Sequence, residues 1–251
     1  MGIKTNDEIA IMRMGGRILA DTLEKVSQYI KPNITLKELD QIAQEYIESK
    51  NAQPSFLGYS PEGASFPYRA SICASVNDSV VHGIPNGYKL KDGDIITIDL
   101  GVYFKGYHTD SAKTFIVGTG SKEARHLLET TEAALYLGIQ KAKAGHTLGD
   151  IGYAIESYAK KNKIKVIEGL TGHGIGRNLH ELPTVLNTGK PGAGLELKEG
   201  MTIAIEPMFA IGSKYIIHAD DDSYKTEDDS LSAHFEHTIA ITKGEPEILT
   251  K

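Results

Sequence analysis

The segment LKDGDIITID at residues 90–99 has a close counterpart, LKEGMTIAIE, at residues 197–206. Each copy joins a turn containing Lys, an acid and Gly to an apolar, strand-forming run, and each run ends in an acid, Asp99 or Glu206. Turn chemistry alone can produce short repeats, but further pairs of similar segments occur in the same order in the two halves of the chain. They are Thr35-Leu36 with Thr147-Leu148, His82-Gly83-Ile84 with His173-Gly174-Ile175, and His108-Thr109-Asp110 with His234-Phe235-Glu236. The common order indicates an internal duplication.

The local patterns predict helices and strands in both halves. Thr5 with Glu8 and Thr35 with Glu38 have the spacing of capping boxes, so a helix should follow each pair. Another helix pair is expected near 121–143 and 147–161, and strands at 71–76, 94–104, 112–118, 201–206 and 236–242. These elements predict two similar α/β halves related by an approximate two-fold axis, with the acids at the strand ends meeting between them.

The composition narrows the class of protein. The 251 residues are 40% hydrophobic with no marked shift along the chain, so we expect one domain over 1–251. A net charge of −6 argues against nucleic acid as a partner. The apolar stretch 95–104 is too short to span a membrane, and the N-terminus lacks the features of a signal peptide. With Cys73 as the only cysteine, a reducing, cytoplasmic location is expected.

The four acids Asp99, Asp110, Glu206 and Glu236 indicate a metal site. A lone acid at a strand end usually caps a turn, but four buried carboxylates facing one another would need cations, and neither apolar strand contains Lys or Arg. Two divalent ions would balance four carboxylates. An imidazole donor could come from either repeated histidine segment, and each histidine could equally be a structural residue of a turn. Such donors suit Mn²⁺, Fe²⁺, Co²⁺ or Zn²⁺.

Other kinds of catalytic site find less support in the sequence. The chain contains neither a Gly-x-Ser-x-Gly elbow, nor a His-Glu-x-x-His helix, nor a Gly-x-x-x-x-Gly-Lys phosphate loop. Cys73 is a weak candidate for a nucleophile, because nothing in its surroundings predicts a lowered thiol pKa. The remaining histidines are expected to be structural or exposed, namely His126, His146, His218 and His237.

Specific motifs give the chain a family resemblance. They are VND at 76–78, VHGIP at 81–85, IDLG at 98–101, GYHTD at 106–110, GHGIGR at 172–177, HE at 180–181, IEPM at 205–208 and SAHFEHT at 232–238. Over essentially its whole length the chain resembles the type I methionine aminopeptidases. The resemblance implies the pita-bread fold, an α/β architecture with internal pseudo-two-fold duplication in which helices cover a curved, mostly antiparallel sheet.

The resemblance also implies a division of the metal ligands. Asp99, Asp110 and Glu236 would bind one ion, and Asp110 and Glu236 would bridge to a second ion held also by His173 and Glu206. His82 would not be a ligand. This distinction between the two repeated histidines comes from the resemblance alone.

The implied activity is metal-dependent hydrolysis of the first peptide bond, removing N-terminal methionine from peptides and nascent proteins when the second residue is small. Two cations that share a water molecule would lower the pKa of that water toward roughly 7, and the hydroxide would attack the first carbonyl. Glu206 would pass the proton to the leaving amine, and His82 and His180 would hydrogen-bond the substrate and its tetrahedral intermediate. The methionine pocket implied by the resemblance is lined by Tyr59, Tyr68, Cys73 and Leu179.

The chain departs from the family pattern at two places. It has no tryptophan, although a Trp commonly closes the pocket; the corresponding loop is 219–224, where Tyr224 is the expected substitute. His234 stands where glutamine is usual. The short interval from Glu206 to Glu236 leaves no room for the inserted helical subdomain of type II relatives, and no zinc-binding extension precedes the catalytic part. We expect a monomer that associates transiently with the ribosome.

Two rival functions share these features. A proline-directed aminopeptidase of the same fold would use the same ligands, but such enzymes usually carry a large preceding domain. A non-catalytic binding protein of this fold would typically have lost metal ligands, whereas all five ligand residues are present here. Cleavage of Met-Ala-Ser against an X-Pro peptide separates the first rival, and peptide binding without methionine release would indicate the second.

Overall fold

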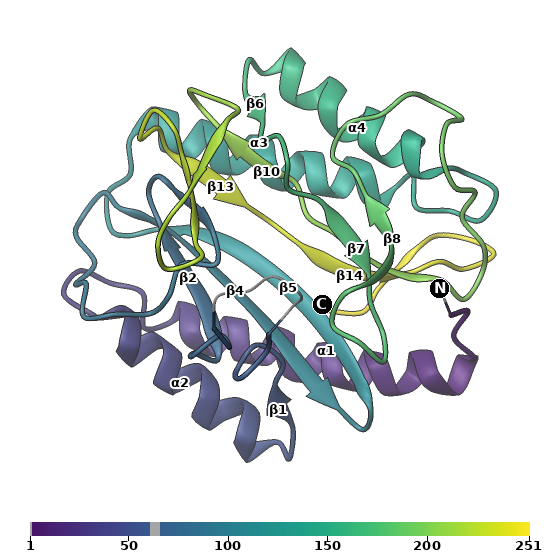
Figure 1. The fold of residues 1–251 in the computed structure, drawn as a ribbon, viewed down its shortest axis with the longest axis horizontal. Coiled ribbons are helices and arrows are strands. Elements are labelled where there is room, and N and C mark those ends of the chain that lie inside the picture. The colour runs from purple at the N-terminus through teal and green to yellow at the C-terminus, as the bar shows by residue number, and fades with distance from the viewer. Residues whose placement is uncertain (1, 61–65) are drawn as a thin grey trace.

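A long β-hairpin forms the centre of the N-terminal half (Figure 1). In the computed structural model, which describes residues 2–60 and 66–251, strand β4 (Ile95–Phe104) pairs along its whole length with β5 (Tyr107–Ile116). Lys105 and Gly106 connect them, both with positive φ (49° and 92°), the conformation of a tight hairpin turn. Asp99 pairs with Ala112 and Gly101 with Asp110, so the two aspartates lie diagonally on the same face.

Two helices and two further strands complete this half. Helices α1 (Asn6–Ser27) and α2 (Leu36–Ser49) begin at the predicted capping boxes, and β1 (Gln53–Pro54) and β2 (Ile72–Val76) flank β4 as antiparallel neighbours. The apolar faces of both helices pack with β2 and β4 into one hydrophobic cluster.

The C-terminal half repeats the helix pair with α3 (Lys122–Ile139) and α4 (Leu148–Lys161). Its largest sheet has the order β15-β14-β9-β7-β8, and two three-stranded sheets have the orders β13-β10-β6 and β11-β12-β3. The bounds are Ser79–Val81 (β3), Lys165–Val166 (β6), Gly172–Gly174 (β7), Glu181–Val185 (β8), Thr202–Ile205 (β9), Met208–Ala210 (β10), Ile216–His218 (β11), Tyr224–Thr226 (β12), Ser232–His234 (β13), His237–Ala240 (β14) and Glu247–Ile248 (β15). A second hydrophobic cluster joins α3 and α4 to β9, β10, β13 and β14.

The duplication predicted from the sequence extends to individual backbone contacts. An isolated bridge joins Thr35 to Lys89 in the first half, and the matching bridge joins Thr147 to Glu196 in the second. The amide of Leu36 donates to the carbonyl of Tyr88, and that of Leu148 to Leu195, at equivalent positions. Each helix pair is therefore attached in the same way to the turn before its repeated strand, which confirms the two-half architecture.

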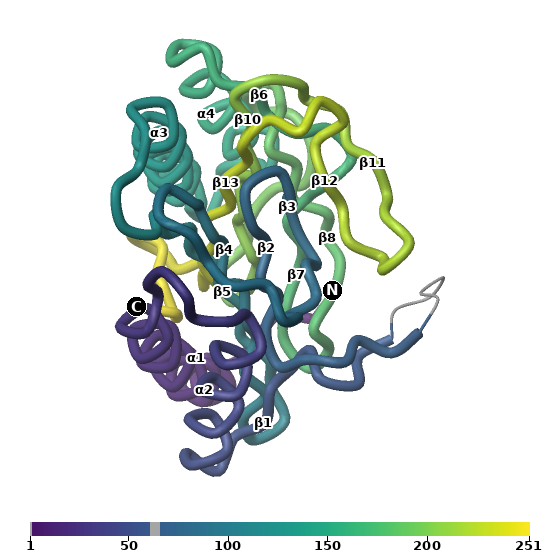
Figure 2. Tube along the Cα trace, turned by 90° about the vertical axis from the view of Figure 1, so that its left-hand side faces the viewer, coloured from purple at the N-terminus to yellow at the C-terminus, as the bar shows by residue number. Residues whose placement is uncertain are grey.

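The helices and the smaller strands lie on opposite sides of the molecule. In Figure 2 the helices α1, α2 and α3 lie to one side of the long strands, and β3, β7, β8, β11 and β12 lie to the other.

The predicted elements differ from the observed ones mainly at β5. We expected a strand at 112–118, but β5 begins at Tyr107 because the polar run from Tyr107 to Ser111 continues the pairing with β4. Pairing with a neighbouring strand overrode a weak local pattern. Within the described part of the chain, no helix is both long and apolar enough to cross a membrane.

Candidate metal centre

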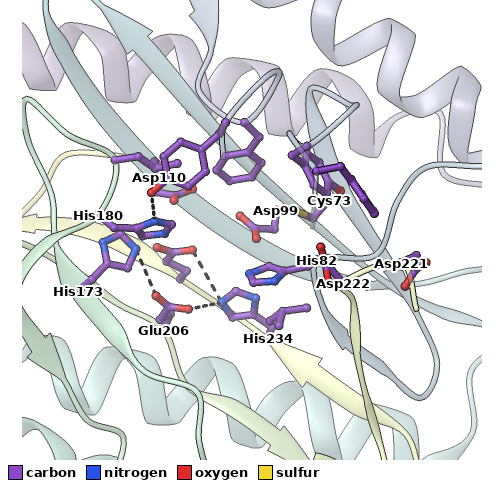
Figure 3. A pocket seen from close by; sticks show the side chains of 17 residues that line it. Cys73, His82, Asp99, Asp110, His173, His180, Glu206, Asp221, Asp222 and His234 are labelled. Carbon is purple, nitrogen blue, oxygen red and sulfur yellow. Dashed lines mark hydrogen bonds and ion pairs between the residues drawn. The ribbon is translucent and has the colours of Figure 1, made fainter. Parts of the chain in front are cut away.

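All eleven residues predicted for the site line one pocket between the two halves (Figure 3). They come from β2 and the segment before it, from the β4–β5 hairpin, from β7 and the loop that follows it, from the end of β3, and from the ends of β9 and β14. The structure adds pocket-lining residues that were not predicted: Phe56, Phe66, Val81, Asp221, Asp222 and His234.

The second pair of carboxylates is placed by strand pairing. β9 pairs with β14 so that Ile205 lies opposite His237, and the next step of the same register brings Glu206 opposite Glu236. The amide of Glu236 donates to the carbonyl of Ala112 on β5 at 2.9 Å. The glutamates of the C-terminal half thereby face the aspartates of the N-terminal half.

Threonine hydroxyl groups join the two halves on either side of this point. The Thr238 hydroxyl accepts from the amide of Asp110 (2.9 Å) and donates to its carbonyl (2.8 Å). The Thr114 hydroxyl bonds in the same way to the amide (2.9 Å) and carbonyl (2.8 Å) of His234. These bonds satisfy backbone groups that would otherwise be buried without partners. At this seam, formed by residues 110–114 of β5 and residues 234–238, threonine side chains thus take the place of some of the ladder hydrogen bonds.

The four carboxylates are buried, and none of them pairs with a lysine or arginine within residues 2–60 and 66–251. Burial raises the pKa of Asp110 to about 7, and burial followed by neighbouring carboxylates raises the pKa values of Asp99 and Glu236 well above normal. Burial and then Asp110 do the same for the pKa of Glu206. One oxygen each of Asp99, Asp110 and Glu236 is buried with no hydrogen-bond partner. Such a cluster is costly without cations, so its chemistry fits divalent ions.

His173 presents a free imidazole nitrogen to this cluster. Its Nδ1 donates to the carbonyl of Gly174 (2.8 Å), which leaves the Nε2 lone pair free, 3.5 Å from Oε1 of Glu206. Burial lowers the pKa of His173 and favours the neutral ring that binds metals. A Cβ atom at Gly172 or Gly174 would lie 2.4 Å from the Ala204 carbonyl oxygen or 2.2 Å from that of Leu182, respectively, so only glycine allows β7 to pack this closely.

Potential metal-binding atoms of these side chains lie close together. Donor atoms of Asp110, His173 and Glu236 lie within 4.8 Å of one another, as do those of Glu206, His234 and Glu236. Glu236 belongs to both groups. The structure therefore brings the five predicted ligands together and adds His234 to them.

The other two predicted histidines flank the cluster. His82 follows β3 with a φ of 61°, a left-handed conformation that is strained for this residue type. His180 Nδ1 lies 2.7 Å from the Tyr59 hydroxyl, and its ring packs against His173 with centroids 4.4 Å apart. Burial, followed by the neighbouring histidines, lowers the pKa of His180 to about 3. Both rings reach the pocket.

The predicted methionine pocket forms an apolar wall beside the acids. Cys73 and Leu179 are buried in one hydrophobic cluster, with Tyr59 and Tyr68 packed against it. The Tyr68 hydroxyl donates to the carbonyls of Ile72 and Gly83. Burial, and then the charge of Asp99, raises the pKa of the Cys73 thiol, which agrees with its rejection as a nucleophile.

The expected replacement of the missing tryptophan by Tyr224 stays a prediction. Tyr224 packs edge-on against His82, with ring centroids 5.8 Å apart, but it is not among the described residues that line the pocket. Asp221 and Asp222 of the same loop line it instead. Residue spacing could not reveal this, because β12 pairs with β3 through an irregular register at Tyr224.

His234 is the functional candidate that sequence reasoning missed. The sequence shows a histidine where glutamine is usual, but it does not show where the ring points. The available signal was its spacing from Glu236, because residues two apart on an extended strand face the same side.

Comparisons with known proteins agree with this geometry. The model of metallopeptidase family M24 matches residues 10–243. Methionine aminopeptidase 1 of Bacillus subtilis is 48% identical over 249 residues (99% of this chain and 98% of that protein), and the Clostridium perfringens methionine aminopeptidase is 46% identical over 250 residues (99% and 98%). The crystal structure of the methionine aminopeptidase from Rickettsia prowazekii matches with a TM-score of 0.96 and 41% identity, covering all of both chains.

A more distant likeness concerns the fold alone. The prolidase from Pyrococcus furiosus matches with a TM-score of 0.79 at 22% identity, and the match covers 99% of this chain and 65% of the prolidase. The expected pita-bread architecture is therefore confirmed. From the family match and the full-length relatives, the chain belongs to metallopeptidase family M24 and, within it, to the methionine aminopeptidases.

Proposed function

We propose that residues 1–251 form one catalytic domain that removes N-terminal methionine from peptides and nascent proteins, preferentially when the second residue is small. Membership of the methionine aminopeptidases makes the protein a metal-dependent exopeptidase. The observation that carries the proposal is the convergence of four buried carboxylates and a free imidazole nitrogen beside an apolar wall.

Two divalent ions, of Mn, Fe, Co or Zn, are part of the proposal. Asp99, Asp110 and Glu236 would hold one ion, and Asp110, Glu236, His173 and Glu206 the other. This assignment is supported by the buried carboxylate oxygens of Asp99, Asp110 and Glu236 that have no hydrogen-bond partner among the described residues. Bound ions would supply Lewis acidity and lower the pKa of a water molecule.

The protein's own groups would then handle protons and position the substrate. Glu206 is assigned the transfer of a proton to the leaving amine, because its carboxylate lines the pocket beside the proposed ions. His82 and His180 are assigned hydrogen bonds to the substrate and to the oxyanion that develops at the scissile carbonyl. Tyr59 holds the His180 ring through the bond to Nδ1, which leaves Nε2 directed away from Tyr59.

The apolar wall is assigned recognition of the methionine side chain. Tyr59, Tyr68, Cys73 and Leu179 offer aromatic, sulfur and aliphatic surface, on which a flexible thioether packs well. The substrate's remaining residues would extend out of the pocket, and the preference for a small second residue is tested with the same assay.

The test is release of methionine from Met-Ala-Ser by protein first treated with chelator, with and without added Mn²⁺, Co²⁺, Fe²⁺ or Zn²⁺. We expect release only with metal, little leucine from Leu-Ala-Ser, and slower release from Met-Lys-Ser. Cleavage of an X-Pro peptide in place of Met-Ala-Ser would favour the proline-directed alternative. Peptide binding without release under any metal would favour a binding protein.

The proposal also covers the location, oligomeric state and partners of the protein. We infer a cytoplasmic monomer whose substrate is a free peptide or nascent-chain N-terminus, without nucleic acid or membrane as partner and with transient ribosome association. Light scattering after gel filtration tests the monomer, and cosedimentation with ribosomes carrying a short nascent chain tests the association.

A further inference from the structure

His234 is fully enclosed and faces the carboxylate cluster. It is 1% exposed, and both ring nitrogens are buried with no hydrogen-bond partner among the described residues. His234 on β13 lies opposite Met208 on β10. This pairing continues the register in which His237 on β14 lies opposite Ile205 on β9. His234 therefore lies on the same face as Glu206 (Figure 3), and its ring also lies near the carboxylate of Glu236. A buried imidazole without partners is unusual, and it calls for a ligand.

The distances to its neighbours suit donor atoms around one ion. His234 Nε2 lies 3.5 Å from Oε2 of Glu206 and 3.8 Å from Oε2 of Glu236. Donors about 2.1 Å from a tetrahedral ion lie roughly 3.4 Å apart. His173 Nε2 lies 3.5 Å from the other oxygen of Glu206, so this carboxylate stands between two imidazoles.

The backbone of His234 is held firmly in this position. The Thr114 hydroxyl bonds to both its amide and its carbonyl, and the Thr114 hydroxyl also lies 2.8 Å from that of Thr97. A ligand whose backbone is held from the opposite half loses little conformational freedom when it binds.

The equivalent histidine of the other half provides an internal contrast. His108 precedes Asp110 by the same two positions by which His234 precedes Glu236. However, His108 Nδ1 lies 2.9 Å from the Ser55 hydroxyl, and the ring packs against Tyr103. His108 is satisfied by its neighbours and is absent from the described pocket lining.

We propose that His234 Nε2 is a metal ligand, so that the centre of this protein binds its ions with two imidazoles. The inference deepens the proposed function and rests on the metal centre described there. A second nitrogen donor should favour Co²⁺ and Zn²⁺ over Mn²⁺, because imidazole suits the later metals better than it suits Mn²⁺.

A crystal structure of the wild-type protein loaded with Zn²⁺, with ions located by anomalous scattering, tests the ligation directly. We expect His234 Nε2 at about 2.1 Å from an ion. An ion bound by Glu206 and Glu236 with His234 Nε2 beyond about 3 Å would overturn this inference and leave the metal centre intact. A protein that binds no ion at all would overturn the metal centre and the inference together.

Binding titrations of His234→Gln provide an independent readout, with His108→Gln as the matched control. We expect Zn²⁺ and Co²⁺ affinity to fall about ten-fold or more in His234→Gln, with a smaller fall for Mn²⁺. His108→Gln should keep the wild-type affinities. Equal losses in both variants, or none in His234→Gln, would contradict the inference. Circular dichroism shows whether each variant is folded. If His234→Gln does not fold, the crystal structure of the wild-type protein provides the test.

Discussion

Asp110 combines a backbone role and a site role in one residue. Its amide and carbonyl bond to Thr238 of the other half, while its carboxylate is buried with an oxygen that lacks a partner. The same residue is proposed to bridge the two ions. Its side chain should therefore matter for metal retention far more than for folding.

We predict that Asp110→Asn abolishes activity and retention of both ions, because a neutral amide cannot bridge two cations. Without metal the variant should unfold at the wild-type temperature or above it, because one charge is removed from a cluster of repelling carboxylates. Metal analysis after dialysis and thermal unfolding provide the measurements. Asp21→Asn, at an exposed position of α1, is the control. Wild-type activity in Asp110→Asn would contradict the two-metal scheme.

At the scale of elements, the connection after β3 has little room to vary. A Cβ atom at Gly83 would lie 2.5 Å from the carbonyl oxygen of Ala74, on the neighbouring strand β2. The carbonyl of Gly83 accepts a hydrogen bond from the amide of Ala74, and the amide of Gly83 donates one to the Ser75 hydroxyl. This contact holds the strained His82 beside it in place.

We expect Gly83→Ala to displace His82 and to lower kcat/KM for Met-Ala-Ser by ten-fold or more, since small misplacements of a positioning group have large effects. Metal stoichiometry should be unchanged, because His82 is not a proposed ligand. Gly87→Ala is the control, because a Cβ atom there meets nothing within 4 Å. Similar rates for both variants would show that this close approach does not position His82.

The threonine bonds of the seam are a second feature of this scale. Thr238→Val keeps the side-chain shape but leaves both the amide and the carbonyl of Asp110 without a partner. We expect a loss of about 1–3 kcal/mol in the free energy of unfolding, measured in urea. Thr131→Val, where the hydroxyl bonds only to the Leu127 carbonyl within α3, should cost less. Equal losses would show that the seam bonds contribute no more than a helix-internal bond.

At the scale of the whole molecule, the metal centre links the two halves. Asp99 and Asp110 come from the N-terminal hairpin, while His173, Glu206 and Glu236 come from the second half, and each half has its own hydrophobic cluster. Ions bound between the two halves would stabilise the contact between them.

Chelation should therefore lower the thermal stability of the entire protein. An ion present at 100 times its dissociation constant contributes about 2.7 kcal/mol, which for a chain of this size corresponds to roughly 5–10 °C in Tm. Scanning calorimetry with and without EDTA measures the shift. In Asp110→Asn the shift should largely vanish. An unchanged Tm in the wild-type protein would argue against ions bound between the halves.

Local chemistry explains what the sequence by itself determined. The capping boxes at Thr5 and Thr35 set the starts of α1 and α2, because the partners lie three residues apart and need no distant contact. The repeated segments ending in Asp99 and Glu206 predicted the two-half architecture and the convergence of acids. The identities of the five proposed ligands were likewise readable from the motifs.

Only the tertiary structure decided which side chains complete the site. His108 and His234 occupy matching positions in the repeat, yet Ser55 satisfies the first, while the second faces the acids without a hydrogen bond to any described residue. Likewise, Tyr224 lies against His82 rather than in the pocket lining. The reason is physical: capping and periodicity act over a few residues, whereas the surroundings of a side chain depend on strand register and on partners from distant segments.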